Sequence, residues 1–194
     1  MLAKQVPDRV HSDLARHGVA NLPTPASILI CGLSNLAKHV SERTPSHLLS
    51  LLTPAHMPAT PMTVLPANHL KVACHDIVEP FPGAILPDET HLTSIIDFSR
   101  SWDGTKPMLI HCFAGVSRST AAALVVAAAR ETRPVETLTE QLRSVAPHAH
   151  PNHHMISIAD TLLELEGTFV AAVQRMGFGK LVDNSPLVEL NVTL

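Results

Sequence analysis

Tyrosine is absent from this chain of 194 residues, which has a single tryptophan and only 3% aromatic residues. Cysteine is almost as scarce, with Cys31, Cys74 and Cys112 as its three occurrences. So small and odd a set cannot make the disulfide framework of a secreted domain, and it suits a reducing compartment. We therefore expect a cytoplasmic protein whose thiols are free.

Long apolar runs and clusters of positive charge are missing as well. The longest apolar stretch, Ala121 to Ala129, is far shorter than the roughly eighteen residues that would cross a bilayer. The first residues contain no apolar core of a signal peptide. The net charge of −3 and the lack of any lysine or arginine run argue against nucleic acid as the main partner. The sequence predicts neither a membrane nor a nucleic-acid partner, and it leaves the oligomeric state open.

Hydrophobic patterning predicts strands that alternate with helices, followed by helices alone. The expected strands cover residues 27–31, 46–52, 69–74 and 108–111. Residues 54–66 hold four prolines and are expected to be a loop, or at best a short edge strand at 62–65. The expected helices cover 33–40, 88–102 with Asp88 as its cap, 119–131, and two further segments that begin at Pro134 and Asn152.

This order of elements indicates an α/β fold. We expect a small, mainly parallel central sheet of four to five strands, flanked by helices on both faces. A single domain is expected over residues 25–176, after a loosely organised leader at 1–24 and before a tail at 177–194.

One segment, His111 to Thr120, joins an expected strand to the apolar helix at 119–131. A strand-to-helix turn of this kind directs backbone N–H groups and a helix N-terminus at an anion. Cys112 and Arg118 lie six positions apart in it, with Gly115 between them. The helix terminus and the cation both favour thiolate over thiol. The segment therefore predicts a phosphate cradle with a nucleophile at its base.

The same segment resembles the signature loop of the cysteine-dependent protein tyrosine phosphatases, and most of all their dual-specificity branch. That branch often carries the pattern His-Cys-x-Ala-Gly-x-Ser-Arg-Ser, and the similarity extends from about residue 28 to about residue 163. The resemblance implies a three-layer phosphatase sandwich, as in small bacterial-type phosphatases, and hydrolysis through a phosphocysteine without metal or other cofactor. The matching residues are His111, Cys112, Ala114, Gly115, Ser117, Arg118 and Ser119.

The resemblance also implies a role for each residue of the loop. Cys112 is the expected nucleophile, and Arg118 would grip two phosphoryl oxygens with its planar guanidinium. Ser119 would donate a hydrogen bond to the cysteine sulfur or cap the helix, and His111 would brace the loop. The residues expected to bind the phosphate are Phe113, Ala114, Gly115, Val116, Ser117 and Arg118.

Hydrolysis also needs a carboxylic acid that protonates the leaving oxygen. The candidates are Asp76, Asp88, Glu89 and Asp103. We favour Asp76, which follows an expected strand 36 residues before the cysteine, and the acid of dual-specificity phosphatases is similarly placed. Asp88 has an alternative role as a helix cap and Asp103 lies in a turn, but neither is excluded.

The chain contains thirteen histidines, and four of them surround the pair Pro151–Asn152, so a metal site has to be considered. No HExxH or CxxC spacing supports it, so we expect no metal. The Pro-Asn pair resembles one that precedes the last core helix of many of these phosphatases, where a structural role is expected. Whether Cys74 forms a protective disulfide with Cys112 depends on a distance that the sequence does not give.

The expected function is hydrolysis of phosphate monoesters, by a tyrosine or dual-specificity phosphatase. Enzymes restricted to phosphotyrosine resemble one another in having a deep pocket, one wall of which is a loop that carries a tyrosine. This chain has no tyrosine and cannot form that wall. The loop interior at 113–117 has no lysine, which favours a phosphorylated protein or a small aryl phosphate over an inositol polyphosphate. The alternatives are a binding module that does not cleave phosphate, a phosphatase of another ester, and sulfur chemistry.

Overall fold

The computed structural model describes residues 26–130, 133–182 and 185–192. The leader expected at 1–24 lies outside these residues. Within them, a central sheet has the strand order β3-β2-β4-β1-β5. Its strands are β1 (Ala26–Gly32), β2 (His47–Leu52), β3 (His69–Ala73), β4 (Met108–Cys112) and β5 (Val188–Val192). All neighbouring pairs are parallel except β1 and β5, which are antiparallel. The predicted fold class, an α/β protein with a mainly parallel sheet, is confirmed.

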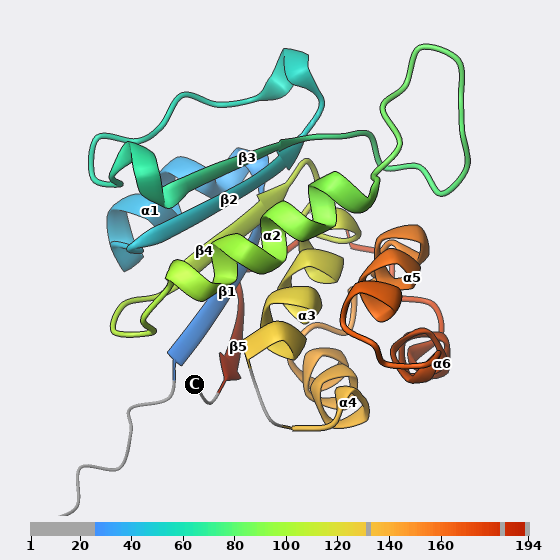
Figure 1. The fold of residues 1–194 in the computed structure, drawn as a ribbon. Coiled ribbons are helices and arrows are strands. Elements are labelled where there is room, and N and C mark those ends of the chain that lie inside the picture. Colours follow the sequence, from blue (N-terminus) through green and yellow to red (C-terminus); the bar gives the residue numbers. More distant parts are fainter. Residues whose placement is uncertain (1–25, 131–132, 183–184, 193–194) are drawn as a thin grey trace, which may run out of the picture.

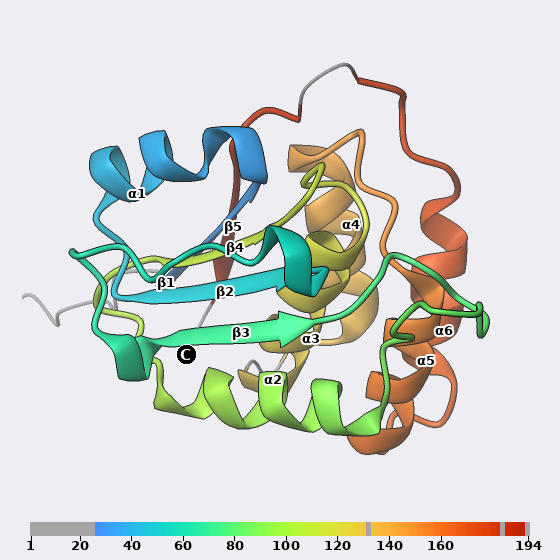
Figure 2. The same ribbon diagram turned by 90° about the horizontal axis from the view of Figure 1, so that it is seen from above.

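Helices cover both faces of this sheet (Figures 1 and 2). One face carries α1 (Leu36–Arg43), which follows a short 3-10 turn, η1 (Leu33–Asn35). Short 3-10 turns also flank the segment between β2 and β3, at η2 (Pro54–His56) and η3 (Pro66–Asn68). The opposite face carries α2 (Glu89–Ser101), α3 (Arg118–Arg130), α4 (Val135–Val145), α5 (His153–Leu162) and α6 (Thr168–Met176).

Strand alternation divides the core into two clusters. Successive side chains of a strand point to opposite faces of the sheet. On β1, Ile28 and Ile30 therefore pack with the larger group of helices, whereas Leu29 and Cys31 pack on the side of α1. The same alternation sends Cys112 towards the larger cluster and its neighbour His111 towards the other face. The two residues at the end of β4 thus meet different surroundings.

Helix α3 runs through the centre of the larger cluster. It contacts α2, α4 and α5 as well as the sheet, and its residues from Arg118 to Ala127 are buried. An apolar surface on all sides is what a helix enclosed by other helices requires. Because α3 is held on every side, its N-terminus is a rigid point at the carboxyl edge of the sheet.

The sheet edges differ from the sequence-based expectation at one place. Residues 62–65 form no strand, as the prolines on both sides of this segment led us to expect. The fifth strand, β5, comes instead from the segment expected to be a tail. Its residues are alternately buried and exposed, with Val188, Leu190 and Val192 facing the core. This period of two was a signal in the sequence, although five residues are short for recognition.

Candidate active site

The loop between β4 and α3 lies at the carboxyl edge of the sheet, and we call residues 113–118 the phosphate loop. Gly115 has a φ of +76°, a backbone conformation that side chains disfavour. A Cβ atom built there would also lie 2.7 Å from the backbone of Cys31 and of Gly32. Glycine is therefore required for the loop to close against β1.

Cys112 lies at the base of this loop and is 1% exposed. Its Sγ atom lies 3.2 Å from the hydroxyl oxygen of Ser119 and accepts the N–H of Gly115 at 3.2 Å. The sulfur thus lies beside the N-terminus of α3, with the backbone N–H of Gly115 directed at it.

The other two cysteines lie in different surroundings. Burial raises the pKa of Cys31 to about 12 and that of Cys74 to about 11. Both side chains are fully buried, and all three cysteines are free. Cys31 and Cys74 are therefore protonated, unreactive thiols at neutral pH.

Neighbouring segments hold the phosphate loop from outside by its carbonyl groups. The backbone N–H of Leu33 donates to the carbonyl of Phe113 at 3.0 Å, and the N–H of His150 donates to that of Val116 at 2.9 Å. The hydroxyl of Ser185 donates to the carbonyl of Ala114 at 2.6 Å. Ser185 belongs to the segment expected to be a tail, so its contribution was not predicted.

Arg118 begins α3 and is 5% exposed. Its Nη1 donates to the backbone carbonyl of Cys74 at 2.8 Å. Its Nε is buried and has no hydrogen-bond partner among the described residues. A cation at a helix N-terminus is unfavourable unless an anion binds there. A guanidinium held in place by one nitrogen, with another free to donate, is arranged to bind such an anion.

Of the four candidate acids, the structure brings Asp76 to the phosphate loop. Its Oδ1 accepts the hydroxyl of Ser117 at 2.7 Å and the amide Nδ2 of Asn152 at 3.0 Å. Its Oδ2 lies 3.8 Å from Nε of Arg118. One carboxylate oxygen is thus fixed by two donors, and the other is directed towards the anion site.

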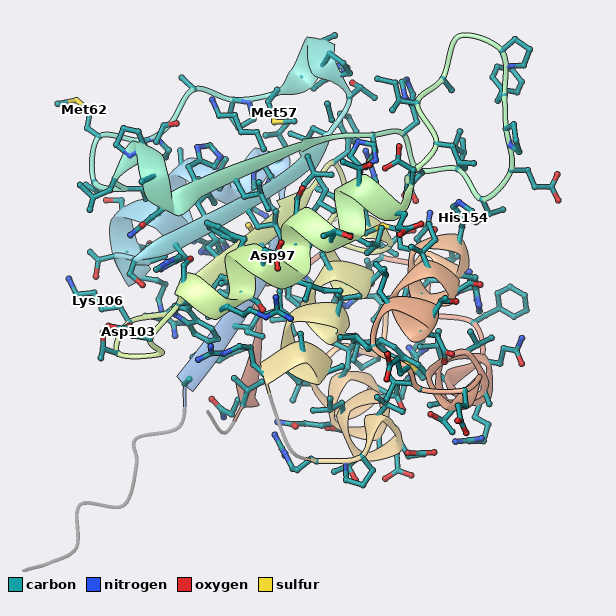
Figure 3. The ribbon with its side chains drawn as sticks, in the orientation of Figure 1. Met57, Met62, Asp97, Asp103, Lys106 and His154 are labelled. Carbon is teal, nitrogen blue, oxygen red and sulfur yellow. The ribbon has the colours of Figure 1, made fainter. Side chains whose placement is uncertain are left out.

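The remaining candidates are occupied elsewhere. Asp88 caps α2 in a capping box with His91, as expected, and Glu89 is the first residue of that helix. Asp103 accepts the backbone N–H and the hydroxyl of Thr105 in the turn before β4. These bonds lower the pKa of Asp103. Figure 3 shows Asp103 beside Lys106 in this turn, at the end of β4 opposite to Cys112.

The loop that carries Asp76, residues 76–87, is closed at its base, and we call it the acid loop. The N–H of His75 donates to the carbonyl of Ile85 at 2.8 Å, and the N–H of Ile85 donates to Nδ1 of His75 at 2.9 Å. At the far end, Nε2 of His154 lies 2.9 Å from the carbonyl oxygen of Pro87. Figure 3 shows His154 at the start of α5, next to this loop.

Asn152 joins the acid loop to α5. Its side-chain oxygen caps α5 by accepting the N–H of Met155 at 3.1 Å. Its Nδ2 donates to Asp76 and, at 3.2 Å, to the carbonyl of Ile77. The cap was predicted from the sequence, but the contact with Asp76, 76 residues away in the chain, was not.

A buried hydrogen-bonded chain reaches His111 from the α1 face of the sheet. Its Nε2 lies 2.6 Å from Ser50 Oγ, which lies 2.8 Å from Nε2 of His69. Nδ1 of His69 lies 2.9 Å from Thr60 Oγ1. Because the single hydroxyl proton of Ser50 can serve only one imidazole, the other imidazole must donate to it. Ser50 therefore links the two imidazoles across the sheet from β2.

No set of three or more His, Cys, Asp or Glu side chains arranged to hold a metal ion occurs in the described part of the chain. Over the same residues, none of the helices has the length and apolar character needed to cross a membrane.

Solved structures of known proteins share the architecture of this chain. The crystal structure of DUSP15 matches with a TM-score of 0.57 and 16% identity, over 81% of this chain and 96% of that one. A structure of PTPMT1 in complex with PI(5)P matches with a TM-score of 0.52 and 11% identity, over 76% and 92% of the two chains. The chain has the fold of the dual-specificity phosphatases. No family model and no curated protein matches it.

A third structure with this phosphatase fold is a mouse putative dual-specificity phosphatase complexed with zinc tungstate. It matches with a TM-score of 0.50 and 17% identity, over 85% of this chain and 98% of that one. The expected three-layer phosphatase sandwich is thereby confirmed at the level of the fold. Within this fold, the chain places Cys112, Arg118 and Asp76 at one edge of the sheet.

Stability of this phosphatase fold is expected to fall in mild acid because of His69 and His111. Burial lowers the pKa of each to about 4, whereas an unfolded histidine has a pKa of about 6.5. Between these values the unfolded state binds protons that the folded state does not. The stabilisation present above pH ~6.5 is therefore lost as the pH falls, by about 2 kcal/mol per histidine at pH ~5.

Urea denaturation at pH ~7.5 and ~5 measures this loss. His69→Gln keeps groups that can hydrogen-bond to Ser50 and Thr60 but cannot titrate. It should therefore reduce the difference in unfolding free energy between the two pH values by about 2 kcal/mol. An unchanged difference in this variant would show that His69 does not titrate with a lowered pKa.

Proposed function

We propose that this chain is a phosphomonoester hydrolase of the cysteine-dependent, dual-specificity-like type. The observation that carries the proposal is that three side chains, those of Cys112, Arg118 and Asp76, lie together at one edge of the sheet. The sulfur of Cys112 accepts the N–H of Gly115 and lies 3.2 Å from the hydroxyl oxygen of Ser119. The buried Nε of Arg118 has no hydrogen-bond partner among the described residues, and Oδ2 of Asp76 lies 3.8 Å from it. The fold shared with dual-specificity phosphatases supports the same chemistry.

In the first step, the Cys112 thiolate attacks phosphorus and the bond to the leaving oxygen breaks. Asp76, as the general acid, gives its proton to that oxygen. Its Oδ2, which lies 3.8 Å from Nε of Arg118, would carry the proton. The S–P bond forms as the alcohol departs, which leaves a phosphocysteine. Arg118 and the N–H groups of the phosphate loop stabilise the charge on the equatorial oxygens.

In the second step, water attacks the phosphocysteine while the Asp76 carboxylate accepts a proton from it. The S–P bond breaks, and the electron pair returns to sulfur as thiolate. The hydroxyl of Ser119, 3.2 Å from Sγ, is placed to donate to the developing negative charge. Ser119 thus assists departure of the sulfur. Phosphate leaves, and the enzyme returns to its starting state.

A binding module that recognises phosphate without cleaving it is the alternative. It would not require a carboxylate beside the anion site, and Asp76, with one oxygen fixed by Ser117 and Asn152, favours hydrolysis. The three free thiols fit the reducing interior of a cell, and we place the activity in the cytoplasm.

Turnover of an activated aryl phosphate tests the proposal. We expect release of inorganic phosphate without added metal. Mass spectrometry of acid-quenched enzyme should detect one phosphoryl group on the peptide that contains Cys112. Absence of turnover for aryl, peptidyl and inositol phosphates alike would favour the binding module.

Asn152 provides a further prediction, because its two bonding roles can be separated. Asn152→Ser and Asn152→Ala both remove the amide Nδ2 that donates to Asp76, and the shorter serine side chain does not replace its reach, so both should lower kcat by about tenfold. Serine keeps the cap of α5, whereas alanine loses it and should cost about 1 kcal/mol more in unfolding free energy. Full activity in the serine variant would show that Asn152 does not position the acid.

A further inference from the structure

A pocket of about 570 Å³ adjoins the phosphate loop, and we call it the leaving-group pocket. It lies between the first half of the acid loop and the residues that lead into α5. Asp76 and Ser117 line it and also belong to the candidate active site. The pocket is therefore continuous with the place where a phosphoryl group would bind.

The direction of the reaction indicates what enters this pocket. In an in-line displacement, the leaving oxygen lies on the side of phosphorus opposite to the cysteine sulfur. The acid must be within hydrogen-bond distance of that oxygen. Since the pocket begins at Asp76, the rest of the leaving group must extend into it.

The walls of the pocket are mainly apolar and aromatic. Val78 and Phe81, on the acid loop, are 53% and 68% exposed, although both are large and apolar. On the opposite wall, the ring of His150 stacks on Phe178, with centroids 5.3 Å apart and planes at 16°. The ring of His153 meets His150 edge-on at 5.6 Å. Exposed apolar side chains gathered around a pocket are typical of binding sites.

Positive charge is lacking from these walls. No lysine or arginine lines the pocket in the part of the chain that the structure describes, and Glu79 adds a carboxylate. The pKa of His153 is lowered, first by burial and then by His150, so its ring is neutral at pH ~7. A second phosphate or carboxylate on the leaving group would therefore meet no lysine or arginine in these walls, and it would be repelled by the carboxylate of Glu79.

We propose that the leaving-group pocket selects phosphate monoesters whose leaving group is bulky, aromatic or apolar, and free of a second anionic group. The proposal rests on the proposed hydrolase function. It separates monophosphorylated aromatic substrates, such as a phosphotyrosyl side chain with apolar or basic neighbours, from inositol polyphosphates. The selection is made by the acid loop and α5, outside the phosphate loop itself.

Three aryl phosphates test the proposal: phenyl, naphthyl and 4-(carboxymethyl)phenyl phosphate. Their phenols have similar acidity, so differences in kcat/KM report on binding of the leaving group. Naphthyl phosphate should be hydrolysed about tenfold more efficiently than phenyl phosphate, and the carboxymethyl ester less efficiently than either. A phosphorylated inositol with several phosphates should be the poorest substrate.

Two substitutions, at Phe81 and Glu79, test whether these residues of the acid loop cause the preference for apolar, uncharged leaving groups. Phe81→Ala should lower kcat/KM for naphthyl phosphate about fivefold and leave phenyl phosphate nearly unchanged. Leu65→Ala is the matched control, because Leu65 is also 68% exposed but lies before β3, at the other end of that strand. Glu79→Lys should raise the relative use of the carboxymethyl ester about fivefold or more.

The outcomes separate this proposal from the underlying function. If none of the esters is hydrolysed, the hydrolase function itself is wrong. If phenyl phosphate is hydrolysed, but kcat/KM for naphthyl phosphate is no higher and Phe81→Ala does not change it, only the proposed selectivity of the leaving-group pocket is wrong. Preferential hydrolysis of the inositol polyphosphate would also overturn it.

Discussion

Serine in place of Cys112 is expected to abolish turnover of aryl phosphates, by at least about 10³-fold in kcat/KM. The substitution replaces sulfur by oxygen, whose hydroxyl is far less acidic than a thiol and does not ionise in this site. The fold should be retained, because Cys112 lies among buried residues that a smaller side chain does not disturb. Release of phosphate from an aryl phosphate measures the loss.

The control for this experiment is Cys31→Ala. Cys31 is equally buried, but it lies on the α1 side of the sheet, and its raised pKa keeps it protonated. This variant should retain most of the activity. Substantial turnover in Cys112→Ser, or an equal loss in Cys31→Ala, would contradict the assignment of the nucleophile.

Asn in place of Asp76 is expected to slow turnover by about 10²–10⁴-fold for an ester with a poor leaving group. Asparagine has the shape of aspartate but has no proton to give to the leaving oxygen. An electron-withdrawing leaving group needs less help, so the loss should be smaller for a nitrophenyl ester. Measuring kcat across aryl phosphates of graded acidity gives a steeper dependence on leaving-group pKa in the variant.

Asp103→Asn is the matched control for this prediction. Asp103 carries the same side chain but lies at the amino end of β4, away from Cys112 (Figure 3). Its substitution should change kcat by less than about twofold. If Asp103→Asn or Asp88→Asn proves the damaging change and Asp76→Asn does not, the acid has been assigned wrongly.

Much of the fold could be predicted from the sequence, because its signals are local. The buried strands β1, β2 and β4 are short apolar runs that end at glycine, at proline or at the phosphate loop. Helix α3 is apolar on all sides, which is typical of a helix enclosed by others. By contrast, β5 is only five residues long and pairs with β1, which lies far away in the sequence. A period of two over so few residues does not distinguish a strand from an irregular segment.

The candidate site also has a part that could be predicted from local sequence and a part that could not. The phosphate loop is one continuous segment, so the sequence contains both its residues and their spacing. Asp76 could be favoured because an acid after a strand tends to lie at the carboxyl edge of a parallel sheet, and because the resemblance to dual-specificity phosphatases implies an acid at a similar position. Its contacts with Ser117 and Asn152, and the bond from Ser185 to Ala114, join residues 41 to 76 positions apart.

The sequence by itself determined the segment that carries Cys112 and Arg118, its place between a strand and a helix, and the class of sheet that holds it. These depend on neighbouring residues and on the periods of helices and strands. Only the tertiary structure decided which acid reaches the cradle, which residues fix it, and what lines the pocket beyond it. Those contacts arise when α5 and the acid loop pack side by side, and no local pattern records that packing.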